Sequence, residues 1–227
     1  MFRFVLLDLD DTILDFLKSE EEALAKTLLQ FGIRPTEAVT AAYSRINLAQ
    51  WKMLERGEIT RELLKVRRFS LLFEELGLDC DAEVARVSYE KNLSETCYFV
   101  PDALQLLDTL YQKYRLFIVS NGITAVQNGR IAASGIAKYF EKIFLSEEVG
   151  FVKPQKEFFD ACFAEISDFN PAEAIIIGDS LSSDIRGGIN AGIKTCRFNY
   201  RGLPADPNTV PDFETRDLCE IPKILEQ

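Results

Sequence analysis

The chain of 227 residues contains no histidine, and this absence removes several kinds of chemistry at once. Without imidazole there is no Ser-His-Asp or Cys-His nucleophile system and no histidine-ligated zinc site. Any reaction must therefore be carried out by carboxylates, hydroxyls, lysine or a bound metal ion.

The sequence also lacks long hydrophobic runs and paired cysteines. No apolar segment approaches the roughly 18 residues of a membrane span, and the short run from Phe4 to Leu7 is too short for a signal peptide. The five cysteines form no CxxC pair and leave one over, which favours reduced core thiols over a disulfide framework. We therefore expect a cytoplasmic protein, a monomer or weak homo-oligomer, that does not bind membranes.

Positive charge is scarce, with 26 Lys and Arg against 36 Asp and Glu and a net charge of -10. Binding to nucleic acid or to an anionic membrane needs clustered positive charge, so both are disfavoured as partners. The length and the content of 47% hydrophobic and 27% charged residues suit a globular protein with one large domain, or a core with a smaller insert.

Short apolar segments alternate with helical ones over much of the chain. A run rich in β-formers at 2–9 predicts a first strand, and similar runs follow at 116–120, 143–146, 174–178 and 194–198. Such alternation favours an α/β fold with a doubly wound, Rossmann-like parallel sheet, in which ligands bind outside the carboxyl ends of the strands. The proline-rich tail from Asn199 is expected to wrap the core before a short last helix.

Residues 16–95 interrupt this alternation with helical periodicity alone. Gly32, Gly57 and Gly77 each follow a helical pattern, which predicts about four helices and no strand. Ser19 and Glu22 predict a capping box for the first helix. We expect an all-helical cap at 16–95 inserted into a core formed by 1–15 and 96–227.

Polar residues stand at the ends of four predicted strands. Asp8 and Asp10 lie two residues apart, on the same side of an extended chain. The full set is Asp8, Asp10, Asp11 and Thr12; Ser120, Asn121 and Gly122; Lys153 and Pro154; and Gly178, Asp179, Ser180 and Asp184. Crowded carboxylates repel one another unless a cation is present, and magnesium is the hard divalent ion that suits a site of oxygen ligands. With magnesium, Lys153 would offset the charge of an incoming phosphate.

These motifs resemble, in order and position, those of the haloacid dehalogenase (HAD) superfamily of phosphatases with a helical cap after the first strand. The resemblance implies that Asp8 attacks phosphorus and that Asp10 protonates the leaving oxygen and then activates water. Asp8, the Asp10 backbone carbonyl and Asp179 would bind magnesium, with Asp184 ordering its waters or Lys153. The phosphate oxygens would be held by Ser120, the Asn121 amide and Lys153.

A narrower resemblance connects the segments 118–122, 146–154 and 176–188, together with the cap segment 51–60, to the noncanonical pyrimidine nucleotide 5'-nucleotidases. It implies hydrolysis of nucleoside 5'-monophosphates, with a preference for pyrimidines. Thr12, Trp51 and Arg68 are the substrate-binding candidates. Trp51 is the only tryptophan, and the sequence leaves open whether it stacks on a base or packs in the cap.

Other functions use parts of the same pattern. A 2-haloacid dehalogenase needs neither magnesium nor Asp10, so this reaction is disfavoured. A sugar-phosphate phosphatase or a β-phosphoglucomutase-like phosphotransferase would use the same core residues and stays open. A receiver-like or non-catalytic phosphate-sensing module is a more distant alternative, because receiver domains lack a helical insert of about 80 residues.

Overall fold

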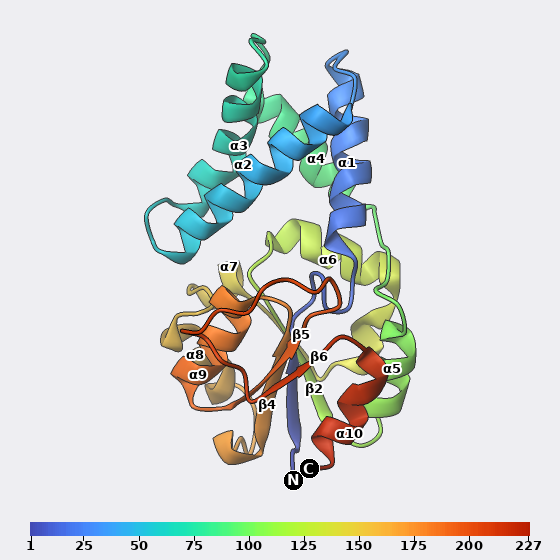
Figure 1. Cartoon of the computed structure of the whole chain (residues 1–227), viewed down its shortest axis with the longest axis vertical. Coiled ribbons are helices and arrows are strands. Elements are labelled where there is room, and N and C mark those ends of the chain that lie inside the picture. Colours follow the sequence, from blue (N-terminus) through green and yellow to red (C-terminus); the bar gives the residue numbers. More distant parts are fainter.

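The computed structural model describes all residues, 1–227, and its centre is a six-stranded sheet in which all neighbouring strands are parallel (Figure 1). The strands are β1 (Phe4–Leu7), β2 (Arg115–Ser120), β3 (Lys142–Leu145), β4 (Ala174–Gly178), β5 (Lys194–Phe198) and β6 (Phe213–Thr215). Their order is β3-β2-β1-β4-β5-β6, so β1 lies between β2 and β4. The predicted doubly wound α/β core is confirmed.

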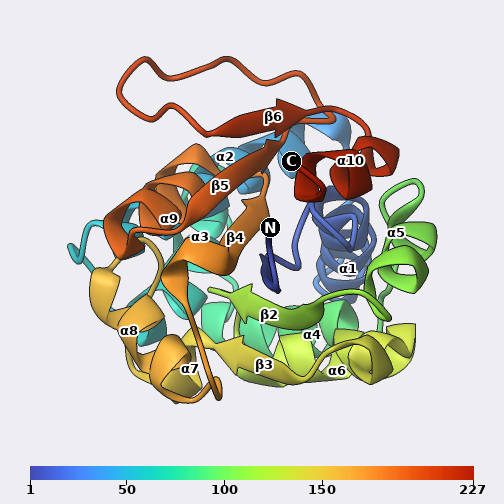
Figure 2. The same ribbon diagram turned by 90° about the horizontal axis from the view of Figure 1, so that it is seen from below.

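Helices cover both faces of this sheet. Seen from below, α5 (Ala103–Leu110) and α10 (Ile221–Leu225) lie on one side, and α8 (Lys156–Ala164) and α9 (Arg186–Ala191) lie on the other (Figure 2). Alternate residues of β1 serve the two layers: Val5 and Leu7 belong to the apolar cluster that contains α5 and α10, and Phe4 and Leu6 to the one that contains α8. All four are buried because both faces of the strand are covered.

The remaining helical elements connect these layers. They are α6 (Thr124–Ser134) and α7 (Ser146–Val149), four short 3-10 or π turns, and the four helices of the insert. The turns are η1 (Ile136–Tyr139), η2 (Pro171–Glu173), η3 (Leu181–Ile185) and η4 (Leu218–Glu220). No helix has the length and hydrophobicity needed to span a bilayer.

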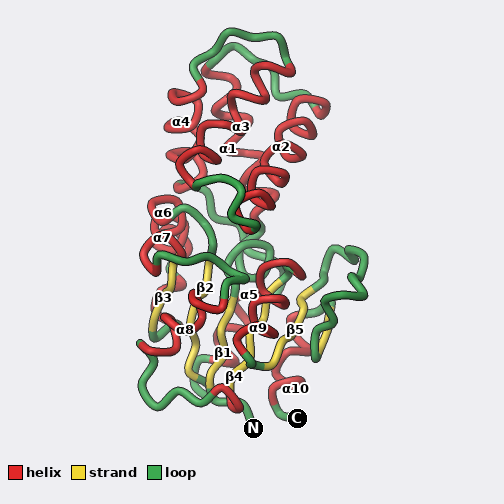
Figure 3. The backbone as a smooth tube through the Cα atoms, turned by 90° about the vertical axis from the view of Figure 1, so that its left-hand side faces the viewer, coloured by secondary structure: helices red, strands yellow, loops and turns green.

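The insert between β1 and β2 consists of α1 (Phe16–Gln30), α2 (Glu37–Glu55), α3 (Arg61–Glu75) and α4 (Ala82–Ser94). It stands beyond the carboxyl ends of the strands, opposite the chain termini (Figures 1 and 3). Its apolar interior includes the buried rings of Tyr43, Phe69 and Tyr89, with centroids 5.3 to 5.5 Å apart. Four helices without a strand are what the sequence predicted, and we call them the cap, with 16–95 as its proposed extent.

Three of the cap helices end at a glycine, as predicted, and each of these glycines has a left-handed conformation. Gly32, Gly57 and Gly77 have φ values of 69°, 71° and 66°, which a residue without a Cβ adopts at little cost. The predicted capping box of Ser19 and Glu22 is wrong. Asp15 caps α1, accepting the Lys18 N–H at 3.0 Å, because the extended linker ends there. Ser19 lies inside the helix and donates to the Asp15 carbonyl at 2.8 Å.

The tail adds a strand that the sequence did not predict. β6 pairs in parallel with β5, with Cys196 opposite Phe213 and Phe198 opposite Thr215. It has only three residues and follows a loop rich in proline and aspartate, so its own sequence carries little strand signal. The expected short last helix is present as α10.

The two linkers between core and cap run side by side. Leu14 and Phe99 form an antiparallel bridge, the Asp15 N–H donates to the Tyr98 carbonyl at 2.8 Å, and the Val100 N–H donates to the Ile13 carbonyl at 3.1 Å. The cap is therefore joined to the core by one paired two-stranded connection.

Candidate active site

Asp8 is the first residue after β1, at the point where the strand order of the sheet reverses. Its backbone N–H donates to the Ile177 carbonyl of β4 at 2.9 Å, so the ladder continues one residue past the strand and fixes where the side chain points. The residue is only 6% exposed. The crevice at a reversal of strand order is where open α/β sheets bind ligands, and the cavity described below opens there.

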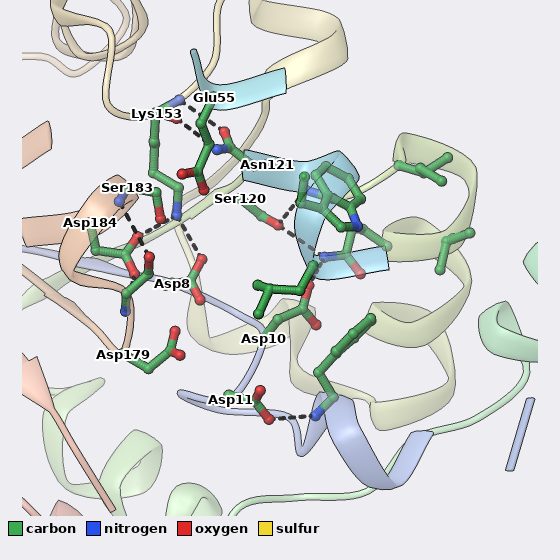
Figure 4. Close-up of a pocket in the computed structure, with 18 of the residues that line it drawn as sticks. Asp8, Asp10, Asp11, Glu55, Ser120, Asn121, Lys153, Asp179, Ser183 and Asp184 are labelled. Atoms are coloured by element: carbon green, nitrogen blue, oxygen red, sulfur yellow. Dashed lines mark hydrogen bonds and ion pairs between the residues drawn. The ribbon is translucent and has the colours of Figure 1, made fainter. Parts of the chain in front are cut away.

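Lys153 ties Asp8 to a second carboxylate. Its Nζ lies 2.6 Å from Asp8 Oδ1, 2.6 Å from Asp184 Oδ1 and 2.7 Å from the Val119 carbonyl oxygen, while the side chain is 1% exposed. The three acceptors match the three protons of the ammonium group. Figure 4 shows the Asp8 and Asp184 carboxylates gathered around the end of Lys153. Burial opposes the charged form, but Asp184 and Asp8 raise the pKa of Lys153 above its ordinary value.

Asn121 holds the loop that carries Lys153. Its Nδ2 donates to the Lys153 carbonyl at 2.8 Å, and its Oδ1 accepts the Lys153 backbone N–H at 2.9 Å. The side chain of Asn121 is therefore occupied, and its backbone N–H is the group expected to bind phosphate. Two motifs that lie about 30 residues apart in the sequence are joined here by a reciprocal pair of hydrogen bonds.

The carboxylates of Asp8, Asp179 and Asp184 each offer an oxygen, and these three oxygens lie within 4.8 Å of one another. Burial raises the pKa of Asp8 to about 8, although the Lys153 charge opposes this rise. Burial, and then the charges of Asp184 and Asp8, raise the pKa of Asp179 well above its ordinary value. Three acids beside one lysine leave negative charge uncompensated, so the oxygen donors and the charge both fit a divalent cation.

The backbone makes room for this cluster at Gly178. A Cβ on Gly178 would lie 2.3 Å from Asp184 Oδ2, so a side chain at this position would displace Asp184. The Ser180 N–H donates to the same oxygen at 3.0 Å. Asp184 is therefore held by both the lysine and the loop that follows β4.

Ser120 closes β2 with its hydroxyl turned toward the cavity wall. Its Oγ accepts the Gly122 N–H at 3.1 Å and the Gln127 Nε2–H at 2.9 Å. Both acceptor positions of the hydroxyl are thus used, which leaves its own hydrogen free to donate to a ligand.

Asp10 lies apart from the carboxylates of Asp8, Asp179 and Asp184 in Figure 4 and points toward α6. Its carboxylate receives hydrogen bonds from Gln127 and Arg130, two residues that the sequence reasoning missed. They stand three positions apart on the helix after Ser120-Asn121-Gly122, so they share one helix face. That spacing was the only sequence signal that could have marked them as site residues, but an arginine on such a helix face is ordinarily exposed to solvent. Because the carboxylate is engaged elsewhere, only the backbone carbonyl of Asp10 is left for the predicted metal site.

A cavity of about 230 Å³ lies between these residues and the cap. The cap contributes Phe16, Leu48, Trp51, Glu55, Arg68 and Leu93, and α6 and the residue before it contribute Val126 and Ile123. Arg68 is 1% exposed, and its Nη2 has no hydrogen-bond partner, although its Nη1 donates to Asn47 Oδ1 at 3.1 Å.

The sequence left two roles open for Trp51, and the structure gives the side chain contacts of both kinds. It lines the cavity and also packs against the apolar cluster of the cap. Thr12 is placed differently from the other substrate-binding candidates, because it is fully buried, its hydroxyl has no partner and it does not line the cavity.

The contacts between the cap and the core include four residues that we call the latch: Arg61 and Lys65 of α3, and Ser146 and Glu147 of α7. Arg61 donates to the Asn121 carbonyl and, at 2.6 Å, to Ser146 Oγ. Lys65 Nζ lies 2.8 Å from Glu147 Oε1. Glu147 also accepts the Thr124 N–H at the start of α6 at 2.5 Å. The latch therefore joins the cap to the loop that carries Ser120 and Asn121.

The sequence profile of the haloacid dehalogenase-like hydrolases matches residues 5–198. A solved structure supports the same family. The crystal structure of the HAD-hydrolase YfnB from Bacillus subtilis, bound to magnesium, superposes on this chain with a TM-score of 0.95 at 38% sequence identity. It covers 100% of this chain and 99% of that one. That structure reveals interdomain movement in YfnB.

Two further relatives carry a named activity. The pyrimidine 5'-nucleotidase PynA of Streptococcus pneumoniae is 37% identical, covering 100% of this chain and 96% of PynA. The pyrimidine 5'-nucleotidase YjjG of Escherichia coli is 28% identical, covering 98% of this chain and 97% of YjjG. The likeness thus extends over the cap as well as the core.

Proposed function

Because this chain belongs to the haloacid dehalogenase-like hydrolases, we propose that it is a magnesium-dependent phosphatase that hydrolyses nucleoside 5'-monophosphates, with a preference for pyrimidines. The observation that carries the proposal is the buried Asp8, paired with Lys153 and flanked by Asp179 and Asp184 at the floor of the cavity. A nucleophilic carboxylate beside a fixed cation and a cluster of metal-ligating oxygens is what phosphoryl transfer requires.

The chemistry uses two steps. Asp8 forms a bond to phosphorus while the bond from phosphorus to the ester oxygen breaks, and Asp10 gives that oxygen its proton. Asp10 then takes a proton from water, which attacks the aspartyl phosphate and restores Asp8. The Ser120 hydroxyl and the Asn121 N–H donate to the phosphate oxygens, and the charge of Lys153, whose protons are given to Asp8, Asp184 and Val119, stabilises their negative charge throughout.

Magnesium fits the carboxylate cluster and would be held by Asp8, Asp179 and the Asp10 carbonyl, with Asp184 keeping Lys153 and the surrounding loop in place. When bound, it would neutralise negative charge on the carboxylates and on the phosphate. This chain's own residues still supply the nucleophile, the acid and the donors to the phosphate.

The upper part of the cavity supports a nucleoside as the leaving group. Its walls are largely apolar and include the rings of Phe16 and Trp51, on which a flat base can stack. The Nη2 of buried Arg68 makes no hydrogen bond and lies 3.9 Å from Glu90 Oε1, and a carbonyl oxygen on a pyrimidine ring would give it a hydrogen-bond acceptor. The names of PynA and YjjG support the same substrate class.

One observation favours sugar phosphates as the second candidate. Glu55 lines the cavity, and its carboxylate is an acceptor for hydroxyl groups. Burial raises its pKa, although Ser182, which donates to Glu55 Oε2 at 2.9 Å, opposes this rise. A sugar phosphate would use Glu55 but would leave the aromatic walls and Arg68 without a matching group.

A panel of phosphate esters tests both candidates. The purified protein is incubated with pyrimidine and purine nucleoside monophosphates, sugar phosphates and an aryl phosphate, with and without magnesium, and released phosphate is measured. We expect magnesium-dependent release that is greatest for the pyrimidine nucleotides. If sugar phosphates give the greatest release, the nucleotidase proposal fails and the phosphatase proposal stands. No release from any ester would refute both.

A further inference from the structure

Both carboxylate oxygens of Asp10 are held by side chains of α6. Gln127 Nε2 donates to Asp10 Oδ2 at 2.7 Å, and Arg130 Nη1 donates to Asp10 Oδ1. Arg130 Nη1 also lies 3.1 Å from Gln127 Oε1, so the three side chains form one closed set of hydrogen bonds. Asp10 therefore has one defined orientation in the cavity wall.

Arg130 forms an ion pair with this carboxylate alone. It is fully buried, Asp10 is its only ion-pair partner, and its Nε and Nη2 have no hydrogen-bond partner. Its guanidinium lies 5.6 Å from the centre of the Phe16 ring. A buried guanidinium is costly unless it is paired, so Arg130 holds the side chain of Asp10 at this place.

Gln127 links Asp10 to the phosphate-binding end of the site. Its Nε2 donates to Asp10 and, at 2.9 Å, to Ser120 Oγ. The neighbouring backbone leaves room for it, because a Cβ on Gly122 would lie 2.2 Å from Gln127 Nε2. The distance between the acid and the phosphate donor is thus set by a single amide group.

The helix that carries this pair is itself held at its first residue and near its middle. Its first N–H, that of Thr124, is bound by Glu147 of the latch. Near its middle it approaches α4 of the cap so closely that a Cβ on Gly129 would lie 2.7 Å from Ser94 Cβ. Gln127 and Arg130 therefore project from a helix with little freedom to shift.

We propose that Gln127 and Arg130 are positioning residues that hold Asp10 where it exchanges protons with the leaving oxygen and with water; this rests on the proposed phosphatase function. A guanidinium only donates, so Arg130 keeps Oδ1 as an acceptor in both steps. Gln127 Nε2 also donates, but it carries no charge and occupies one side of Oδ2. The proton therefore moves on the free side of Oδ2, to the leaving oxygen as its bond to phosphorus breaks, and back from the attacking water. Gln127 touches that same oxygen and fixes its distance from Ser120.

The two residues are tested by the dependence of the rate on the leaving group. The variants are Gln127→Ala, the similarly shaped Gln127→Met, Arg130→Met and the charge-conserving Arg130→Lys. Asn128→Ala is the matched control, because Asn128 is exposed on the same helix. The substrates are 4-nitrophenyl phosphate, whose leaving group needs little protonation, and the alkyl phosphate ester that the wild type hydrolyses fastest.

We expect Gln127→Met and Arg130→Met to lower kcat for the alkyl ester by about 10- to 100-fold, within the contribution of a general acid, with a fall of under about 3-fold for the aryl ester and little change in KM. Arg130→Lys should recover part of the loss, because it restores a charged donor. The control should match the wild type. Melting temperatures measured in parallel identify variants that fail to fold.

Two results would overturn the inference. Equal losses on both esters in well-folded Gln127→Met and Arg130→Met would show that these residues support the fold or Ser120 rather than Asp10. Wild-type rates in both variants would show that Asp10 needs no positioning. A wild-type protein that hydrolyses no phosphate ester would refute the proposed function and this inference together, so the two failures are distinguishable.

Discussion

At the scale of single residues, Lys153 is the side chain on which the site depends most. All three of its protons are directed at oxygens of Asp8, Asp184 and Val119, and almost none of the side chain reaches solvent. A buried ammonium group left with fewer acceptors costs stability, so Lys153 fixes the distance between the nucleophile and the loop after β4. The nucleophile is thereby oriented before substrate arrives.

Asp8→Asn tests the nucleophile without emptying its space. An amide fits the same volume and its oxygen can still accept from Lys153, but it cannot attack phosphorus. We expect steady-state turnover to be lost while the melting temperature stays close to that of the wild type. Asp160→Asn, an exposed carboxylate of α8 paired with Lys156, is the control. Appreciable phosphate release from Asp8→Asn that mass spectrometry shows to be free of deamidation would refute the assignment.

Trp51→Ala tests stacking in the cavity. We expect KM for a pyrimidine nucleotide to rise about 10-fold, which corresponds to loss of a stacking partner worth about 1–3 kcal/mol, while KM for an aryl phosphate changes little. Trp51→Phe keeps a ring and should lie close to the wild type. Trp51 also packs against the apolar cluster of the cap. If Trp51→Ala raises KM for both substrates and lowers the melting temperature, Trp51 is a packing residue and not a stacking partner.

At the scale of elements, the N-terminal part of α3 contacts the core and holds the cap against it. Arg61 and Lys65 both reach α7, and the Lys65–Glu147 pair is only partly exposed to water. Burial favours protonation of Glu147, but Lys65 and the Thr124 N–H lower its pKa below the ordinary value. The stability that this carboxylate contributes to the folded protein is therefore present above its ordinary pKa of 4.5 and is lost only as the pH falls through its lowered pKa.

Glu147→Gln tests the latch at constant shape. The amide oxygen can still accept the Thr124 N–H, whereas the charge that attracts Lys65 and Arg61 is gone. Hydrogen bonds to charged groups are worth about 1.5–3 kcal/mol, so we expect kcat/KM for a nucleotide to fall about 10-fold because cap closure is weakened. Glu148→Gln changes the exposed neighbour and is the control. Equal effects of the two substitutions would show that the latch does not support closure.

At the scale of the whole molecule, negative charge is the dominant property. The chain carries a net charge of -10, and three of its carboxylates converge at the site with one lysine. A bound divalent ion relieves that local repulsion and so acts on stability as well as on activity.

We expect the stabilisation of the folded protein by magnesium to depend on pH. The pKa of Asp8 is raised from 3.8 to about 8 in the metal-free fold, chiefly by burial. The folded chain then holds a proton that the unfolded chain has released, so this contribution to stability is full below 3.8 and is lost as pH rises toward 8. We expect magnesium to raise the melting temperature of the chelator-treated protein more at pH 8 than at pH 5.

The measurement is a melting curve at each pH with and without magnesium, together with phosphate release. Asp179→Ala should reduce both the stabilisation and the magnesium dependence of activity. Calcium is the control ion, expected to stabilise but to support little turnover, because its coordination is longer and looser. Full activity after exhaustive chelation would contradict a metal-dependent mechanism.

The sequence by itself determined the sheet and its polar strand ends. Residues such as Asp8 and Asp179 directly follow apolar strands, and parallel strands bring their carboxyl ends to one edge whatever the intervening loops do. The helical insert was likewise readable, because its helical periodicity is interrupted by Gly32, Gly57 and Gly77. These features follow from local pattern and from the rules of strand pairing.

Tertiary structure alone decided which helix faces meet. Gln127 and Arg130 contact Asp10 across more than 100 residues of sequence, and no local pattern distinguishes them from solvated side chains. The same holds for the latch between Arg61 and Glu147, and for Thr12, whose place in a strand-end motif did not bring it to the cavity. Strand ends converge by a rule of topology, whereas contacts between side chains on separate helices depend on how those helices pack.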